Sequence, residues 1–236
     1  GPNSPATNVL TTAELQQMDP QELVDRIHKI NSFDHKILYY GPEKPQAVLD
    51  IIKQYHNVPE QLQPVPAAIE FSQQETPENR VLLAQYDAKQ IYFSAVSNRG
   101  EKFDPAIQPT LNMYNEYFGG GMNAIVFQEM RELAYSAGAF LITPSKLKYP
   151  YVYRTFIATQ NDKMIDAMKA FDEIINNMPE SEKAFNLAKD ALITRLRTER
   201  ITKSDVLWSY LNAQDLGLNT DGRKELFEKV HIIIKM

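Results

Sequence analysis

Three consecutive glycines, Gly119-Gly120-Gly121, place the strongest constraint on how this chain can fold. Residues 105–118 before them have the apolar spacing of an α-helix, and residues 122–132 after them repeat that spacing. Residues without a Cβ atom permit a tight turn, including the left-handed backbone that ends many helices. We therefore predict a helix, a glycine turn and a second helix, followed by an alternating strand over 133–142.

The composition excludes several classes of protein. With 236 residues, of which 43% are apolar, the chain is long enough to bury a core. It has no run of about 18 uncharged apolar residues, so we expect no membrane span. A net charge of −5 argues against a nucleic-acid-binding surface. The one dense basic run, 195–200, lies in a helical pattern and predicts either a solvated helix face or a partner surface.

The residues that could carry catalysis or bind a metal are few. The sequence has no cysteine, which excludes thiol nucleophiles, disulfides and thiolate metal sites. Its four histidines are His28, His35, His56 and His231, and no two of them flank a glutamate at the His-x-x-Glu-His spacing that holds zinc beside a general base. We therefore predict no catalytic residue and no metal ligand here, while a site assembled from distant histidines and carboxylates stays open.

Other enzyme motifs are also missing. The sequence contains neither a G-x-S-x-G nucleophile elbow nor a phosphate-binding P-loop. The glycine turn follows a predicted helix rather than a strand, and no Lys or Arg lies between Lys102 and Arg131 to neutralise a phosphate. We therefore expect no nucleotide site at the glycines.

The rest of the chain alternates between helical and strand patterns. The spacing predicts helices over 20–30, 47–55, 164–175, 180–200, 204–211 and 223–230. It predicts strands over 35–40, 68–71, 81–84, 91–96 and 151–159, with a proline-rich linker over 59–66. Short connections between strands, with helices in blocks, indicate an α+β fold with a mainly antiparallel sheet covered by helices on one face.

The segment Tyr117–Ser136 resembles the glycine-rich segment of the pitrilysin/insulinase family of zinc metallopeptidases. In that family a run F-G-G-G-x-x-S/N-x-x-F-Q-E-x-R-E-x-x-G-L-A-Y-S lies in the non-catalytic, C-terminal half of the enzyme. The match is specific here and more diffuse through most of the chain. It implies the same α+β fold, of the metallopeptidase-half (clamshell) type. On this template residues 1–60 are the tail of a preceding α/β domain plus a linker, and 61–236 form the non-catalytic domain.

The resemblance also implies a role for Arg131 and Tyr135. Their counterparts in the family reach towards the catalytic half and hold the peptide near the scissile bond, the Arg as a charge-assisted donor and the Tyr through its hydroxyl. Without the resemblance, Arg131 is a surface residue at a helix terminus and Tyr135 a half-buried strand residue. We assign both as substrate-binding residues.

One departure from the family pattern affects this assignment. The family separates the Arg and the Tyr by seven positions, whereas Arg131 and Tyr135 are four apart. Glu132 would then pass directly from a helix into a strand at Leu133, although such links usually take at least about two residues. Either the protein has a short deletion or a segment is missing between them, and we expect the second. Similarly, residues 231–236 could be a closing strand with material missing before it.

The resemblance implies a substrate-cradling part of a zinc metalloendopeptidase, with zinc in a catalytic half of the same polypeptide or of a partner subunit and a peptide as substrate. Two alternatives stay open: an inactive member of the family acting as a scaffold or assembly subunit, and an unrelated binding domain. The start Gly1-Pro2 is either the remnant of a protease site or a point inside a longer protein, and we expect the second. A periplasmic or cell-envelope location is favoured because many relatives are exported.

Overall fold

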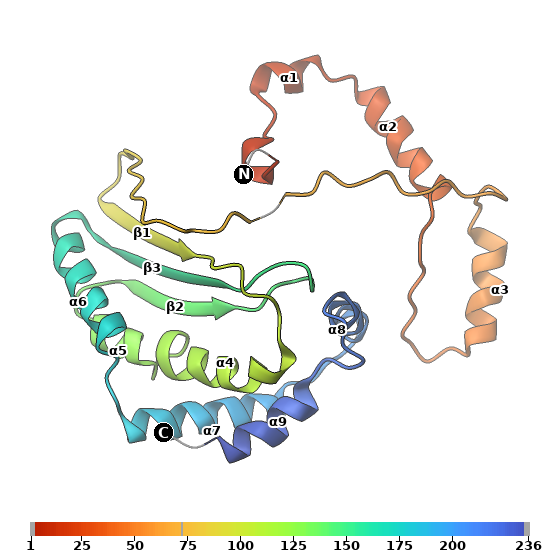
Figure 1. Ribbon diagram of the computed structural model, residues 1–236. Coiled ribbons are helices and arrows are strands. Elements are labelled where there is room, and N and C mark those ends of the chain that lie inside the picture. Colours follow the sequence, from red (N-terminus) through yellow and green to blue (C-terminus); the bar gives the residue numbers. More distant parts are fainter. Residues whose placement is uncertain (1–2, 72, 234–236) are drawn as a thin grey trace. The chain divides into compact units, whose positions relative to one another are not determined.

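The computed structural model describes residues 3–71 and 73–233, and these divide into two compact units (Figure 1). The first unit consists of residues 3–71 with 202–207, and the second of residues 73–201 with 208–233. The antiparallel sheet and all the buried residues belong to the second unit.

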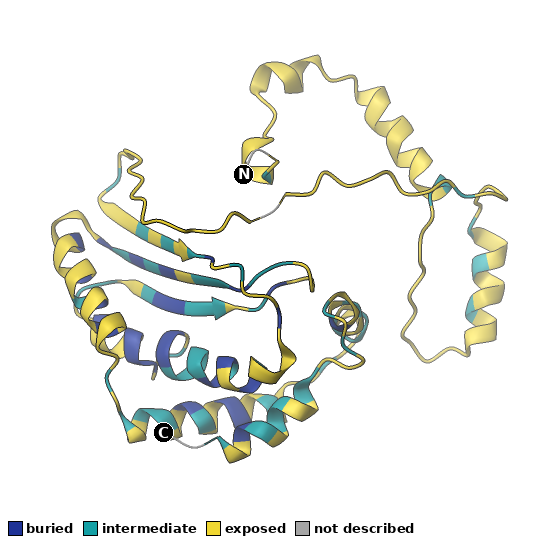
Figure 2. Ribbon diagram, viewed as in Figure 1, coloured by how far each residue is buried: buried dark blue, intermediate teal, exposed yellow. Residues whose placement is uncertain are grey.

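The first unit is built from short helices without a core. Its elements are η1 (Pro5–Thr7), α1 (Thr12–Gln17), α2 (Pro20–Lys29), η2 (Ile30–Ser32) and α3 (Pro45–Tyr55). As the sequence predicts, α2 begins at Pro20, with the Asp19 side chain accepting a hydrogen bond from the Gln21 N–H. None of the described residues 3–71 is buried (Figure 2). The apolar faces of α2 and α3 therefore lie exposed, as shown by Ile27 and Tyr55, which are 64% and 70% exposed.

Three predicted strands are wrong. Residues 35–40, 68–71 and 81–84, all within the described ranges, form no strand. Near the first of them there is only an isolated parallel bridge between Phe33 and Gln63. An extended apolar run becomes a strand only when its N–H and C=O groups pair with a neighbour, and these segments have no such neighbour. Leu82 and Leu83 are accordingly 92% and 95% exposed.

The second unit contains a three-stranded antiparallel sheet. Its strands are β1 (Gln90–Ser97), β2 (Ser136–Ile142) and β3 (Val152–Gln160), in the order β1-β3-β2. Ile157 at the centre of β3 pairs with Phe93 of β1 and with Ala137 of β2. The strands predicted over 91–96 and 151–159 are confirmed, and that predicted over 133–142 is confirmed from Ser136 onward.

Helices cover one face of this sheet. The helices of the second unit are η3 (Pro105–Ile107), α4 (Gln108–Tyr114), the π-helix η4 (Asn115–Gly119), α5 (Ile125–Met130), η5 (Asn161–Lys163), α6 (Met164–Asn176), α7 (Glu182–Thr198) and α9 (Arg223–Ile232), while α8 (Ser204–Asp215) has residues in both units. Figure 1 shows α4, α5, α6, α7 and α9 on the same side of the three strands. The α+β fold with helices on one face is thus confirmed. His231 belongs to α9 rather than to a closing strand, and the prediction for 234–236 lies outside the described residues.

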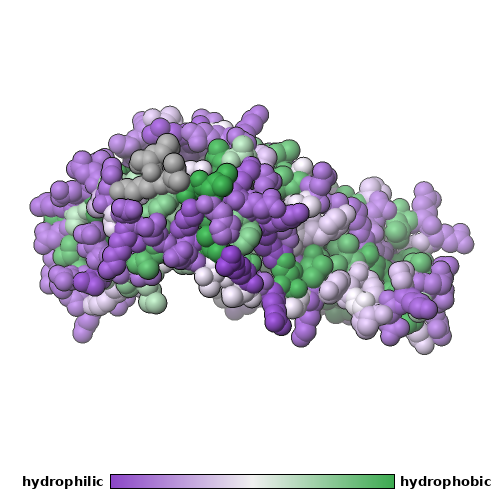
Figure 3. All heavy atoms as spheres, turned by 90° about the horizontal axis from the view of Figure 1, so that it is seen from below, coloured by the Kyte–Doolittle hydropathy of each residue, from purple (hydrophilic) through white to green (hydrophobic). Residues whose placement is uncertain are grey.

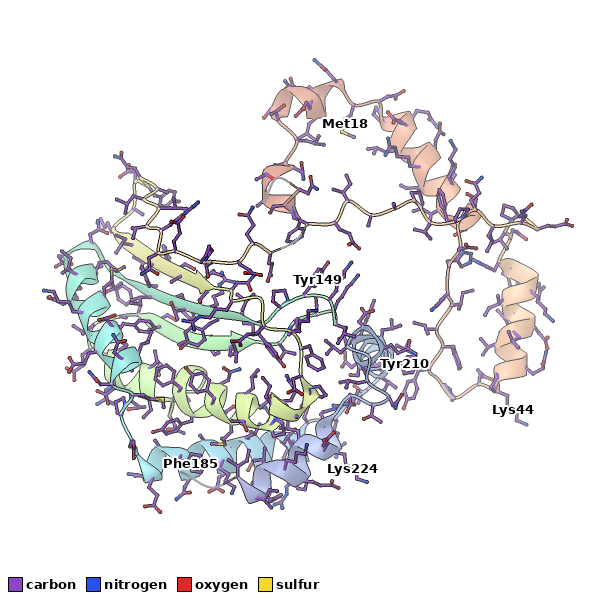
Figure 4. The ribbon with its side chains drawn as sticks, viewed as in Figure 1. Met18, Lys44, Tyr149, Phe185, Tyr210 and Lys224 are labelled. Atoms are coloured by element: carbon purple, nitrogen blue, oxygen red, sulfur yellow. The ribbon has the colours of Figure 1, made fainter. Side chains whose placement is uncertain are left out.

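The core has two main layers. Between the sheet and the helices lies a cluster made of Phe118, Ile125, Val126, Met130, Ala139, Ile157, Ala167, Phe171 and Ile174. A second cluster joins α4, α7 and α9 and consists of Met113, Ala188, Leu192, Ile193 and Val230. Phe185 of α7, labelled in Figure 4, packs against this second cluster. The outer surface of the helical layer is mostly hydrophilic (Figure 3), so α7 and α9 are amphipathic covers with their polar sides in water.

Candidate functional site

The glycine turn lies between η4 and α5 and packs closely against the sheet. A Cβ atom added to Gly119 would be 1.6 Å from the backbone oxygen of Ala139 in β2, so only glycine fits there. The turn does not use the left-handed backbone that glycine permits, because the glycines with positive φ among the described residues are Gly100, Gly217 and Gly222. The glycine run thus serves the close approach of a helix end to a strand.

The helix before the turn is also attached to the edge of β2. The side-chain amide of Asn115 in η4 donates to the Leu141 carbonyl at 2.9 Å, and its oxygen accepts from the Leu141 N–H at 3.0 Å. β2 is an edge strand of the sheet, so these backbone groups would otherwise be left without a strand partner. Asn115 therefore substitutes for a neighbouring strand and holds η4 in place.

A pair of tyrosines joins α4 to β3 within the same layer. The hydroxyl groups of Tyr114 and Tyr153 are 2.8 Å apart and partly buried. Burial, then the hydrogen bond to Tyr153, raises the pKa of Tyr114 far above its usual value. Burial also raises the pKa of Tyr153, although the hydrogen bond between the two hydroxyls opposes that shift. Both groups are therefore neutral at ordinary pH, and the pair is a structural contact rather than a proton donor.

Arg131 is the residue that ends α5, and it is exposed to solvent. Its guanidinium donates to the side-chain oxygen of Gln128, one turn back along the helix, at 3.3 Å. Gln128 in turn donates to the carbonyl of Met122 beside the glycine turn. The C-terminal end of a helix favours a cation, so the position suits Arg131 without any ligand.

Tyr135 lies just before β2. Its N–H donates to the carbonyl of Ala158, and its hydroxyl accepts from the side-chain amide of Gln160 at 2.6 Å. The residue is 59% exposed. Within the described part of the chain no hydrogen bond links Arg131 to Tyr135. The structure therefore exposes both predicted site residues but gives each a different partner.

Glu132 does not pass directly from a helix into a strand, because residues 131–135 lie between α5 and β2. The helix ends at Met130 and the strand begins only at Ser136. Between them the N–H groups of Leu133 and Ala134 both donate to the Met130 carbonyl, at 2.9 and 2.8 Å. The alternating pattern had suggested a strand from Leu133, whereas that residue closes a turn. The connection therefore has a length that is usual for a helix-to-strand link.

The described residues do not fit a zinc site. In that part of the chain no group of three or more His, Cys, Asp or Glu side chains is placed to hold a metal ion. His35 and His56 contact each other instead, with their Nε2 atoms 2.7 Å apart. Sequence spacing had no signal for this contact, because the two histidines are separated by 21 positions.

Sequence reasoning also missed a cavity of about 380 Å³ in the second unit. It lies between the η3–α4 region and the loop that joins α8 to α9, with Phe103 and Leu218 among its apolar walls and Asp221 and Arg223 among its polar ones. The sequence signal that could have indicated this loop is its pair of glycines, Gly217 and Gly222, both of which have a left-handed backbone in the structure. Neither Arg131 nor Tyr135 lines this cavity.

Across the described residues, every helix is too short or too polar to cross a bilayer.

Comparison with known proteins agrees with this architecture. A family model described as the peptidase M16 inactive domain matches residues 19–192. Among solved structures, the chain is similar to a conserved protein from Enterococcus faecalis, with a TM-score of 0.63 and 16% identity over 95% of this chain and 53% of that one. A protease from Helicobacter pylori gives a TM-score of 0.58 and 14% identity over 95% and 55%. The peptidase M16 inactive domain from Pseudomonas fluorescens gives 0.50 and 16% over 63% and 36%.

A search of curated proteins gives no match. The chain spans about half the length of the Enterococcus and Helicobacter proteins, 53% and 55%. These identities show a shared fold, while the family model extends over well more than half of the sequence. The metallopeptidase resemblance of the glycine-rich segment is thereby confirmed, and the chain belongs to the family of peptidase M16 inactive domains.

Proposed function

We propose that this chain is the substrate-cradling, non-catalytic portion of a zinc metalloendopeptidase, with the zinc held by another part of the enzyme. The observation that carries the proposal is the match to the inactive peptidase domain, in a chain whose described residues offer no metal-binding group. The glycine turn supports it, because Gly119 packs on β2 and fixes the start of the α5 segment that leads to Arg131. Because α5 is held against the sheet and the exposed guanidinium of Arg131 stands at its C-terminal end, the guanidinium is suited to contact a peptide carbonyl or carboxylate.

The first unit supports the proposal that residues 1–60 are the tail of a preceding domain and 61–236 the non-catalytic domain. The apolar side chains Leu23, Ile27 and Ile30 are 44%, 64% and 61% exposed. An amphipathic helix is normally stabilised by burying that face. We propose that the catalytic half, in the same polypeptide or in a partner subunit, covers it.

A second candidate function is an inactive scaffold or assembly subunit of the same family. The separate partners of Arg131 and Tyr135, Gln128 and Gln160, favour it, because a substrate clamp needs both groups at one point. The spacing of four positions between them favours it as well.

Peptide hydrolysis by the isolated chain and by its complex separates these functions. We expect the isolated chain to leave peptides intact with or without added zinc, and a complex with its His-x-x-Glu-His partner to cleave them. Zinc-dependent cleavage by the isolated chain would overturn the proposal. A purified complex that binds zinc in its partner half and still leaves peptides intact would support the scaffold.

A further inference from the structure

The sheet of the second unit has one face that none of its own helices covers. Odd-numbered residues of the three strands, among them Phe93, Ala139 and Ile157, pack against the helical core. The even-numbered residues therefore point the other way, because side chains alternate along a strand. We call this second set the open face. Among its apolar members Tyr92 and Val96 are 68% and 53% exposed, and Phe140 and Phe156 are partly buried.

The open face has a single charged side chain, Arg154, at its centre. The even-numbered residues of β1, β2 and β3 contain no Asp or Glu. Arg154 is paired across the sheet with Val96 on one side and Phe140 on the other. Its side chain is exposed, and no hydrogen bond or ion pair joins the guanidinium to another of the described residues. A guanidinium between apolar neighbours attracts a carboxylate, with which it forms two parallel hydrogen bonds.

Beside Arg154 lies a preformed aromatic platform. The rings of Phe140 and Phe156 are stacked, with centroids 6.4 Å apart and an interplanar angle of 14°. Gly138 makes room for them, because a Cβ atom there would be 2.7 Å from both rings. Gly120 of the glycine turn does the same on the other side, at 2.9 Å from the ring of Phe140. Packing against two glycines restricts the rings, which lowers the entropy lost when a ligand binds.

We propose that the open face binds a peptide segment in which an acidic residue and a bulky apolar residue are two positions apart. In an extended peptide such residues project from the same side, about 7 Å apart, which is also the spacing of Arg154 and Phe156 along β3. The carboxylate binds Arg154 and the apolar side chain lies on the Phe140–Phe156 platform. Arg154 makes this face locally positive, which favours an acidic ligand at this one place. This inference rests on the proposed function and names the substrate class of the cradle.

The test is fluorescence anisotropy with the whole 236-residue chain and labelled nine-residue peptides containing Glu-x-Phe, Lys-x-Phe or Glu-x-Ser. We expect the first peptide to bind at least about tenfold more tightly than the other two, since each lacks one contact. Arg154→Ala should weaken Glu-x-Phe binding by about tenfold or more, and Arg154→Glu should reverse the preference towards Lys-x-Phe. Lys169→Ala, which removes a charge from the exposed side of α6, is the matched control and should change nothing.

Equal binding of all three peptides, or affinity unaffected by Arg154→Glu in protein with an unchanged circular dichroism spectrum, would overturn the inference. So would a dimer of the chain that Arg154→Glu dissociates, because the open face would then belong to a second copy. Binding is measured without the catalytic half, so it stands apart from the cleavage test. If the complex cleaves peptides equally well with and without Arg154, only this inference is wrong. If the complex binds Glu-x-Phe but never cleaves it, only the proposed catalytic function is wrong.

Discussion

Asn115 and Leu141 form two hydrogen bonds, 2.9 and 3.0 Å long, between a helix side chain and the backbone of an edge strand. The same pair of bonds would join Leu141 to a neighbouring strand. The contact therefore closes the sheet at β2 and fixes the distance of η4 from it. The glycine turn and α5 follow directly after η4 in the chain.

Replacing Asn115 by Ala should lower the free energy of unfolding by about 1–3 kcal/mol, because two backbone groups lose their partner. Urea denaturation measures this change, and hydrogen exchange at the Leu141 amide should accelerate. Asn112→Ala is the matched control, since its amide only donates to the Gln108 carbonyl of the same helix. An equal loss in both variants would show that the edge contact adds nothing.

Gly119→Ala should destabilise the protein by about 3 kcal/mol, since the new methyl group would overlap the Ala139 carbonyl and the backbone must shift. Gly121→Ala serves as the control, because the nearest atom, a carboxylate oxygen of Glu116, is at an ordinary 3.5 Å. Its unfolding free energy should stay within about 1 kcal/mol of the wild type. Similar unfolding midpoints for the two variants in urea would contradict the close approach.

The stability of the fold should decrease at alkaline pH through Tyr114 and Tyr153. The pKa of each hydroxyl is raised in the folded protein, chiefly by burial. Above the ordinary tyrosine pKa of about 10, the unfolded chain loses these protons while the folded chain keeps them, so stability present below that pH is lost as pH rises. Thermal unfolding between pH 8 and 11 should show a flatter dependence for the Tyr114→Phe, Tyr153→Phe double variant. A Tyr210→Phe variant controls for loss of a hydroxyl, and identical pH profiles for all three proteins would refute the effect.

In a complex with the catalytic half, Arg131→Ala should reduce kcat/KM by about tenfold or more if the guanidinium contacts the substrate. The fold should remain intact, because the guanidinium's contact is a 3.3 Å hydrogen bond to Gln128 at the surface. Tyr135→Phe should lower kcat by a comparable factor if its hydroxyl donates to the developing oxyanion. Arg200→Ala, beyond the end of α7, is the control. Unchanged kinetics in the first two variants would remove both residues from the site and favour the scaffold.

Local patterns were sufficient for most helices and for two of the three strands of the second unit. The apolar spacing of α6 and α7 and the alternation of β1 and β3 are properties of neighbouring residues, so their positions follow from the sequence. The position of the glycine turn also follows from neighbouring residues, since three consecutive glycines separate two stretches of helical spacing. The absence of a His-x-x-Glu-His pair likewise needs no coordinates.

Long-range contacts determined the rest. Residues 81–84 have the pattern of a strand but lack a partner, and Leu133 belongs to a turn because its N–H donates to Met130. Gly119 is required by a strand 20 positions further along the chain, not by its own backbone angles. The partners of Arg131 and Tyr135 could not be foreseen for the same reason. Periodicity reports the environment of a segment, whereas pairing, close approach and the direction of a side chain depend on residues that meet only in the folded chain.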